Sequence, residues 1–398
     1  MEYSCSLTVE DDKIADKRLN RHFDVFLKTF WIFGLDFVGY DGPSMLFKLF
    51  LKIWTCVNIF CYHFCIAVDV VWYFNHKIQE DVLAESVTNW VTVITFDFML
   101  WKRTEMQKLM RLVQTETSKL TEKSQRKQRR QNFVVFISVL LYVIIFVSQN
   151  IVFKLEEGYN KYYHISFLNL ASRNLREFLF QLGGFLKCFF IQGLLTVTIA
   201  FYLLLCLTCK RWFHHLKRQY FGNRRSLNLF EVQKFCSKFD ELSNHVRLLD
   251  CIFSLPVALW LLMILMILCV RIVSILNPLL LTTNQMITVT VLSFSRAVIT
   301  LIQMNFIADS VYKKATITLF QLDTFSRQER RVLNNAMYQE IQMALTRFTF
   351  TPTQLTFWKT ARLSRRFLMT CVGMMTTYVI ISIQLYPNAK RGLESMRG

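Results

Sequence analysis

The chain has little charge, glycine or proline for its length of 398 residues. Charged side chains make up 19% of it, against roughly 25% in an average soluble domain, and there are only 11 glycines and 5 prolines. A soluble protein of this size would need more charge to cover its surface. The hydrophobic content of 53% excludes a disordered chain, and long unbroken apolar runs disfavour a large barrel. The composition therefore predicts a helical membrane protein.

Basic residues outnumber acidic ones, with 47 Lys and Arg against 28 Asp and Glu and a formal net charge of +19. In a soluble protein this excess would suggest a nucleic-acid partner. In a membrane protein it indicates loops held at an anionic cytoplasmic leaflet, so we expect membrane lipid and no nucleic acid as a partner. The charged N-terminus has no short apolar region followed by a cleavage site, which predicts that it stays cytosolic.

Seven stretches are apolar enough to cross about 30 Å of hydrocarbon, which takes about 20 helical residues. They cover residues 53–74, 82–101, 133–153, 178–209, 251–270, 285–308 and 367–385. The fourth stretch is longer than one crossing needs, and we expect it to continue as a helix into the segment that follows.

The basic residues beside the spans predict their orientation. Span two ends before Lys102 and Arg103, and span seven follows Arg365 and Arg366. Basic clusters also precede span three and follow span four. The predicted fold is all-α: a polytopic membrane protein of seven transmembrane helices with a cytosolic N-terminus and an extracellular C-terminus. This topology is the reverse of a G-protein-coupled receptor.

Two cytosolic segments, 210–250 and 309–348, have apolar residues at helical spacing. The two faces consist of Phe235, Phe239, Leu242, Val246 and Leu249, and of Leu333, Met337, Ile341, Leu345 and Phe348. The simplest partner for each face is the other, within one subunit or between subunits; helices lying on the inner leaflet are the alternative. We therefore expect cytosolic amphipathic helices that form an anchor domain.

The predicted division of the chain follows from these spans and segments. It comprises a cytosolic segment at 1–52, transmembrane helices one to six at 53–308 with a cytosolic helical extension at 210–250, anchor helices at 309–366, the seventh transmembrane helix at 367–385 and an extracellular tail at 386–398.

Polar groups inside the spans are candidates for ligand contact. A charge in the middle of a span costs about 2.5–3.5 kcal/mol on insertion scales, so Arg296 and Lys187 call for an explanation. A structural role is the alternative to ligand contact for each charge. A partner within the protein could pair with Arg296, and the Lys187 side chain could reach the outer interface. The candidates at outer and middle depth are Trp90, Tyr142, Gln149, Gln181, Lys187, Gln192, Gln285, Thr288 and Arg296. Together they would form an amphipathic pocket.

One face of the last span contains both polar and apolar residues. Helical spacing places Thr377, Ile380, Ile381 and Gln384 on one side. A glutamine in hydrocarbon lacks partners, so Gln384 must face protein or water. In a pore its carboxamide would stabilise a passing cation, and the isoleucines could close the path by dewetting. The alternative places Gln384 at the outer interface. Tyr378 points off this face, and we expect it to pack on a neighbouring span.

The end of the last span resembles a family signature. Thr377 and Tyr378, five mostly apolar residues, Gln384 and a large apolar residue resemble the run that ends insect gustatory receptors. In that family the run is Thr-Tyr, five hydrophobic residues and Gln-Phe; here Ser382 interrupts the hydrophobic residues and Leu385 replaces the Phe. The inverted seven-span layout matches over nearly the whole chain. Insect odorant receptors share this architecture and are the second candidate.

The resemblance implies a taste receptor that acts as a ligand-gated, non-selective cation channel in the plasma membrane of sensory neurons. It implies a small-molecule tastant, permeating cations and a homotetramer, or a heterotetramer with related subunits. The last span of each subunit would line a central pore, the cytosolic helices would form a shared anchor, and the ligand pocket would lie among spans two to six. It implies no cofactor or metal.

Other function classes find less support in the sequence. Of the seven histidines only His63 lies in a span, and no metalloprotease, serine-hydrolase or phosphate-binding motif is present. We therefore expect no enzyme. A transporter with broken, repeated spans and a seven-span receptor without its own pore remain as alternatives.

Overall fold

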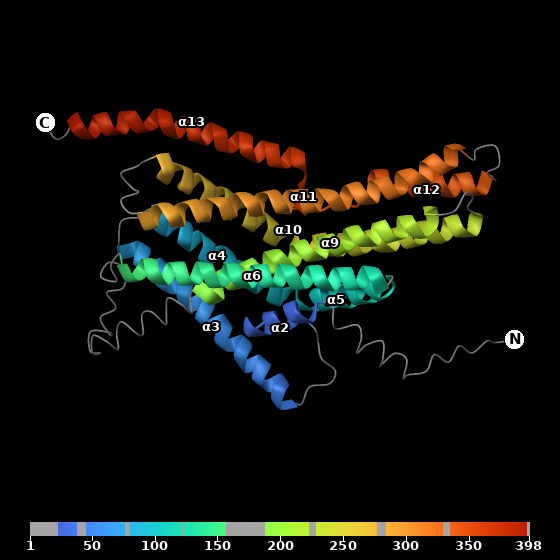
Figure 1. The fold of residues 1–398 in the computed structure, drawn as a ribbon, viewed down its shortest axis with the longest axis horizontal. Coiled ribbons are helices and arrows are strands. Elements are labelled where there is room, and N and C mark those ends of the chain that lie inside the picture. Colours follow the sequence, from blue (N-terminus) through green and yellow to red (C-terminus); the bar gives the residue numbers. More distant parts are fainter. Residues whose placement is uncertain are drawn as a thin grey trace.

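The computed structural model describes residues 23–37, 45–75, 80–120, 122–156, 188–222, 228–276, 284–328 and 335–395, and this part is almost entirely helical. The helices are α2 (Asp24–Ile32), α3 (Met45–Asn75), α4 (Glu80–Trp101), α5 (Arg103–Ser118), α6 (Glu122–Glu156), the π-helical turn η2 (Cys188–Gln192), α9 (Gly193–Phe221), α10 (Leu229–Leu276), α11 (Asn284–Gln328), α12 (Asn335–Phe350) and α13 (Arg365–Ser395). They form an elongated bundle (Figure 1). Strands β1 (Thr356–Phe357) and β2 (Ala361–Arg362) pair antiparallel.

Four helical stretches in the described part are long and apolar enough to cross a membrane: Met45–Ala67, Phe189–Phe221, Leu229–Ile275 and Thr290–Phe325. Each of the seven predicted spans lies on a helix, although residues 178–187 of span four are outside the described ranges. At 1.5 Å per residue the 48 residues of α10 extend about 72 Å, more than twice the hydrocarbon thickness. Helices of this length must continue well beyond the membrane.

Span four continues as a helix beyond Cys209, as predicted, but the prediction that this helix contains the amphipathic face was wrong. Helix α9 ends at Phe221, and the face from Phe235 to Leu249 belongs to α10, which continues directly into predicted span five. A capping box starts α10: the Glu231 N–H donates to Asn228 Oδ1 at 2.8 Å, and the Asn228 N–H donates to Glu231 Oε2 at 3.2 Å. This local signal begins a new helix before the amphipathic face.

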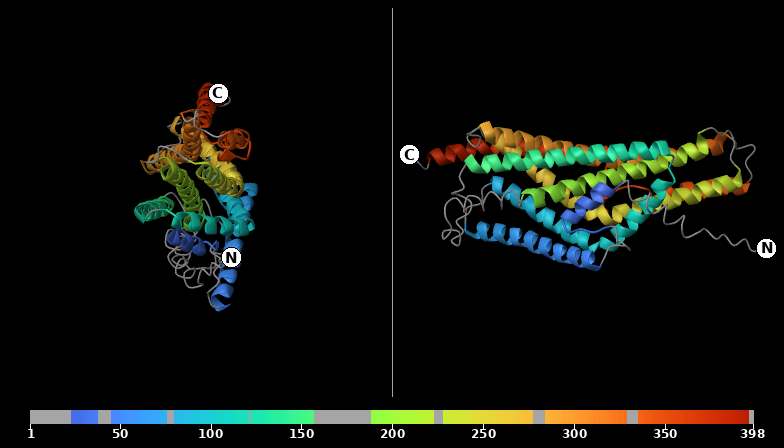
Figure 2. Two further views of the ribbon diagram at one scale, coloured as in Figure 1. Left: turned by 90° about the vertical axis from the view of Figure 1, so that its right-hand side faces the viewer. Right: turned by 60° about the horizontal axis from the view of Figure 1, so that its bottom comes forward.

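The two amphipathic faces meet within one subunit. All five residues of the first face are buried, and on α12 Met337 and Ile341 are buried while Leu345 and Phe348 are half-buried. The rings of Phe239 and Phe348 lie 6.0 Å apart, centroid to centroid. Leu333 lies outside the described ranges. Because these faces pack on protein, they do not lie on a membrane surface. Figure 2 shows α10 and α12 side by side from two further directions.

The segment before span one is structured, which the sequence analysis missed. Phe23, Phe26, Phe30, Phe33 and Phe37 are each at most 2% exposed. Helix α2 packs against α6 and α9, and Phe23, Phe26 and Phe30 all contact the ring of Phe201. The spacing of three and four between these phenylalanines is the helical signal that could have revealed the element.

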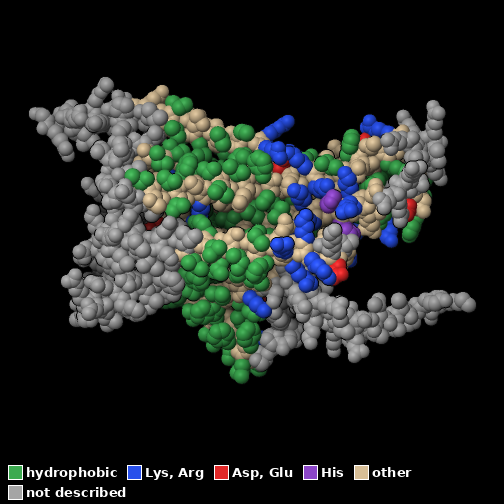
Figure 3. Space-filling model, in the orientation of Figure 1, with side chains coloured by type: hydrophobic (Ala, Val, Ile, Leu, Met, Phe, Trp, Pro, Cys, Tyr) green, Lys and Arg blue, Asp and Glu red, His purple; other side chains and the backbone are tan. Residues whose placement is uncertain are grey.

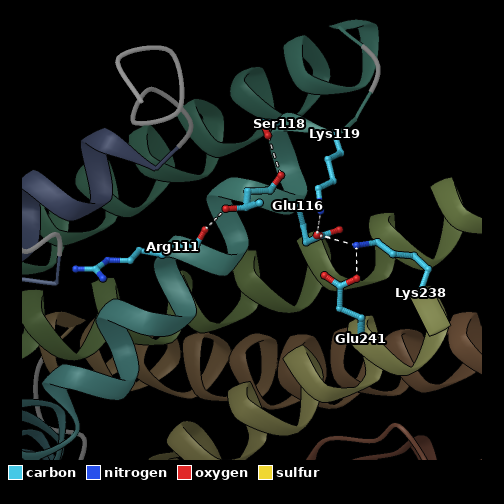
Figure 4. A network of polar contacts seen from close by, with 7 residues as sticks. Arg111, Glu116, Ser118, Lys119, Lys238 and Glu241 are labelled. Atoms are coloured by element: carbon cyan, nitrogen blue, oxygen red, sulfur yellow. Dashed lines mark hydrogen bonds and ion pairs between the residues drawn. The ribbon is translucent and has the colours of Figure 1, made fainter. Parts of the chain in front are cut away.

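An ion-pair network fixes α5 to α10 (Figure 4). The Lys238 ammonium donates to Glu116 at 2.8 Å and to Glu241 at 2.7 Å, and Lys119 donates to Glu116 at 2.7 Å. Burial alone would raise the pKa of Glu116, but the hydrogen bonds from Lys119 and Lys238 outweigh it and lower the pKa below its ordinary value. Glu116 is therefore a buried charge held by two cations.

Candidate ligand site and pore helix

Two other predicted ligand-contact residues, Gln192 and Tyr142, lie against Arg296. The guanidinium donates through Nη1 to Gln192 Oε1 at 3.2 Å and through Nη2 to Thr196 Oγ1 at 3.4 Å. It also lies over the Tyr142 ring, 5.0 Å from the ring centroid. These residues come from α6, from η2 and the start of α9, and from α11, so a single charged side chain connects three helical segments.

Gln192 is the last residue of an irregular helical turn. Residues Cys188–Gln192 form a π-helical turn, and such turns are frequent at functional sites because the extra residue changes which side chains point inward. The next residue, Gly193, lies against α2: a Cβ there would come within 3.2 Å of the Phe33 ring. The absence of a side chain at 193 therefore lets the chain approach α2 closely.

The geometry allows either a structural or a ligand-binding role for Arg296. N–H···O bonds in proteins are about 2.7–3.2 Å long, so the contact to Gln192 at 3.2 Å is at the upper limit and the contact to Thr196 at 3.4 Å is beyond it. A ligand oxygen that bound the guanidinium more closely could compete with them. The aromatic face of Tyr142 stabilises the cation without consuming a hydrogen-bond donor. The site can therefore recognise a hydrogen-bond acceptor next to an apolar or aromatic group.

The other predicted contact residues are placed less centrally. Trp90 lies on α4 with 38% of its surface exposed, and Thr288 is exposed on α11 about two turns before Arg296. Helices α6 and α11 contain Gln149 and Gln285, whose side chains are outside the description, and both Gln181 and Lys187 lie outside the described ranges. Within those ranges, no group of three or more His, Cys, Asp or Glu residues could hold a metal ion.

Helix α13 contains the predicted pore residues, and among its described side chains the buried ones lie along its first part. Leu368 and Cys371 are buried, but in Figure 1 the helix then runs apart from its neighbours. Ile380 is 50% exposed and Ile381 48% exposed. The remaining predicted members of this face, Thr377 and Gln384, are also exposed. Tyr378 is 41% exposed, so within one subunit it does not pack tightly on a neighbouring span.

A short hairpin joins α13 to the rest of the protein. Asp250 of α10 accepts hydrogen bonds from the Thr356 N–H at 2.6 Å and from its hydroxyl at 2.8 Å. The Trp358 N–H donates to the Ser254 carbonyl at 3.3 Å. At the other end of the hairpin the Arg362 guanidinium lies 4.1 Å from the centroid of the Tyr312 ring of α11. The start of α13 is thereby fixed to both α10 and α11.

Comparison with known proteins gives a fold match. No family model and no curated protein matches the chain. Among solved structures, the insect olfactory receptor OR5 from Machilis hrabei matches with a TM-score of 0.73 over 94% of this chain and 100% of that chain, at 11% identity. The same receptor in complex with eugenol also has a TM-score of 0.73 and covers the same shares, at 10% identity. At this identity the likeness concerns the fold, and the chain therefore has the fold of an insect olfactory receptor.

Proposed function

We propose that the chain is a chemosensory receptor that acts as a ligand-gated, non-selective cation channel in the plasma membrane of sensory neurons. The observation that carries this proposal is the fold match over the full length of OR5. The run from Thr377 to Leu385 adds support because it lies at the end of the last span, where the gustatory signature lies.

Taste and smell are both candidates for the sense served. The signature in α13 favours a gustatory receptor, whereas the neighbour solved with eugenol is an olfactory receptor. A small molecule is the ligand in both cases. We assign its contact to the group of Tyr142, Gln192 and Arg296, which offers a cation and an aromatic face in predicted spans three, four and six.

We further propose a homotetramer, or a heterotetramer with related subunits, in which α13 lines a central pore. The exposed face of Thr377, Ile380, Ile381 and Gln384 supports this assignment, because an isolated subunit provides no cover for it. The packed cytosolic ends of α9 to α12 would form the anchor beneath the pore. We expect no enzymatic activity.

Expression of the chain alone in an electrically quiet cell, with a panel of sugars, bitter compounds and volatile odorants, tests the proposal. A ligand-evoked cation current with single-channel steps is the expected result. A current that requires G-protein signalling would instead favour a receptor without its own pore. Saturating flux without unitary steps would favour a transporter.

A further inference from the structure

A cluster of basic side chains lies where α9 and α11 leave the membrane in the proposed orientation. We define the basic patch as Lys210, His214, Lys217 and Arg218 of α9 and Lys314 of α11. Intervals of four, three and one residues place the α9 members on one helical face. The two helices are in contact at this level, because the Thr318 hydroxyl of α11 donates to the Phe213 carbonyl of α9 at 3.2 Å. Lys314 is therefore close enough to Lys210 and Lys217 to be repelled by both, and His214 is repelled by Lys314, Arg218 and Lys217.

The basic patch has no acidic partner in the described part of the chain. Elsewhere on α11, Lys313 pairs with Asp309 at 2.7 Å and Arg327 pairs with Asp323 at 2.9 Å. Among the described residues no carboxylate forms an ion pair with any member of the basic patch. Lys210 and Lys217 of α9 thus face Lys314 of α11 without a countercharge, and Arg218 adds a third permanent positive charge on α9. Their repulsion costs free energy until an anion binds.

The basic patch begins at the predicted inner edge of the hydrocarbon. Predicted spans four and six end at Cys209 and Ala308. At 1.5 Å per residue, Lys210 follows the hydrocarbon directly, and Lys314 and Lys217 lie about 9 and 12 Å beyond the ends of their spans. Each headgroup layer is about 5–8 Å thick, so the patch starts in this layer and ends just outside it, where long lysine side chains can reach back toward a headgroup. Figure 3 shows basic and histidine side chains gathered beside a hydrophobic surface, as a site at this boundary requires.

We propose that the basic patch binds an inner-leaflet phospholipid whose headgroup carries more than one phosphate, and that this lipid holds α9 and α11 together. The inference rests on the membrane orientation in the proposed function. A phosphate monoester carries a charge of about −1.5 to −2, so two of them match the four permanent positive charges. A headgroup with a single negative charge would leave most of the positive charge of the basic patch uncompensated.

A lipid fits this surface better than a soluble phosphate compound does. On the membrane side of the basic patch, α11 exposes Ile299 and Ile302, at 53% and 42%, and acyl chains can cover such side chains. The three half-buried lysines of the basic patch keep their ammonium groups toward water while their stems pack on protein. Headgroup and acyl chains therefore find complementary surfaces at successive depths along α11.

The test measures binding of short-chain phosphatidylinositol bisphosphate to the purified full-length protein in detergent. Lys217→Ala combined with Lys314→Ala is expected to weaken binding roughly 30-fold, the effect of two basic residues at an anionic surface. The control combines Lys48→Ala with Lys52→Ala, two exposed lysines on α3, and should bind as the wild type does. Short-chain phosphatidylserine should bind the wild type more weakly.

Four results would overturn the inference. The first is equal binding by the basic-patch variant and the wild type. The second is equally tight binding of inositol trisphosphate, which lacks acyl chains and would indicate a soluble anion. The third is a changed oligomer size in the variant, since the basic patch would then be a subunit interface. The fourth is an epitope at 223–227 that antibody reaches in intact cells. Lipid binding without ligand-evoked current would leave this inference intact and contradict the channel proposal.

Discussion

At the scale of single residues, substitution of Arg296 distinguishes a ligand-binding role from a structural role that links three helices. Arg296→Ala should raise the ligand concentration for half-maximal current by about tenfold or more, because a hydrogen bond to a charged group contributes about 1.5–3 kcal/mol. Ion selectivity should not change, since the proposed pore residues lie on α13. The measurement is a dose–response curve normalised to surface expression.

The matched control for Arg296 is Ser295→Ala, at an exposed position next to it on α11. This variant should respond as the wild type does. An unshifted curve for Arg296→Ala at normal surface expression would contradict the ligand assignment. A loss of surface expression would instead indicate that the contacts to Tyr142, Gln192 and Thr196 hold the fold.

Glu116 gives a prediction with a pH dependence. Glu116→Gln keeps the shape of the side chain but removes the charge that Lys119 and Lys238 hold, and should cost about 1–2 kcal/mol at neutral pH. Because the pKa of Glu116 is lowered in the folded state, its stabilisation is present above the ordinary value of 4.5 and is lost as pH falls through the folded pKa. The difference in Tm between the two proteins should therefore shrink as the pH falls below 4.5.

Glu122→Gln is the control for this titration, because Glu122 is 77% exposed and pairs with the exposed Arg126. Exposed pairs contribute about 0–1 kcal/mol, so its Tm should stay close to that of the wild type throughout. A Tm difference for Glu116→Gln that persists undiminished at low pH would show that lost packing, and not lost charge, destabilises the variant.

At the scale of elements, the buried face of α10 is the part most sensitive to charge. Leu242 is 2% exposed inside a single subunit. Leu242→Glu would bury a carboxylate without a partner, which costs several kcal/mol, and should lower the yield of folded protein. Asn244→Glu adds the same charge at an exposed position two residues away and should leave the yield unchanged. Size-exclusion profiles of both variants measure the difference, and equal profiles would contradict this account of the interface.

The elements also show what the sequence could and could not predict. The helical spacing from Phe235 to Leu249 correctly predicted a buried face, because periodicity depends on residues close in the chain. Its connection was misassigned because hydropathy alone does not mark a helix start, whereas Asn228 and Glu231 do so through a capping box. Tyr142, Gln192 and Arg296 were three of nine candidates predicted for one pocket, and the sequence did not single them out. Distances between helices depend on packing across the whole bundle.

At the scale of the whole molecule, topology is the assumption on which the other proposals rest. An epitope tag at the N-terminus should be reached by antibody only after permeabilisation, and a tag after residue 398 should be reached in intact cells. The physical reason is the basic flanks of spans two, three, four and seven. The reverse staining pattern would contradict the receptor, pore and lipid assignments together.

The pore prediction concerns the assembled protein, because its residues are exposed in one subunit. In the proposed orientation Ile380 and Ile381 lie deeper in the membrane than Gln384, so the isoleucines would close the path and Gln384 would line it. Ile381→Ser should wet the closure and raise ligand-independent current. Gln384→Glu should add a ring of negative charge and favour divalent over monovalent cations, with little change in ligand sensitivity. Leu46→Ser, at an exposed position at the start of α3, should change neither property.

Reversal potentials in mixed calcium and sodium solutions separate this pore from the outer-interface alternative. If Gln384 touches only lipid headgroups, Gln384→Glu leaves the relative permeability unchanged, since its charge never meets a permeating ion. In a pore of fourfold symmetry every subunit contributes one carboxylate, so the potential should move toward that of calcium. An unchanged reversal potential, at a current density like that of the wild type, would remove Gln384 from the conduction path and return α13 to the role of a lipid-facing helix.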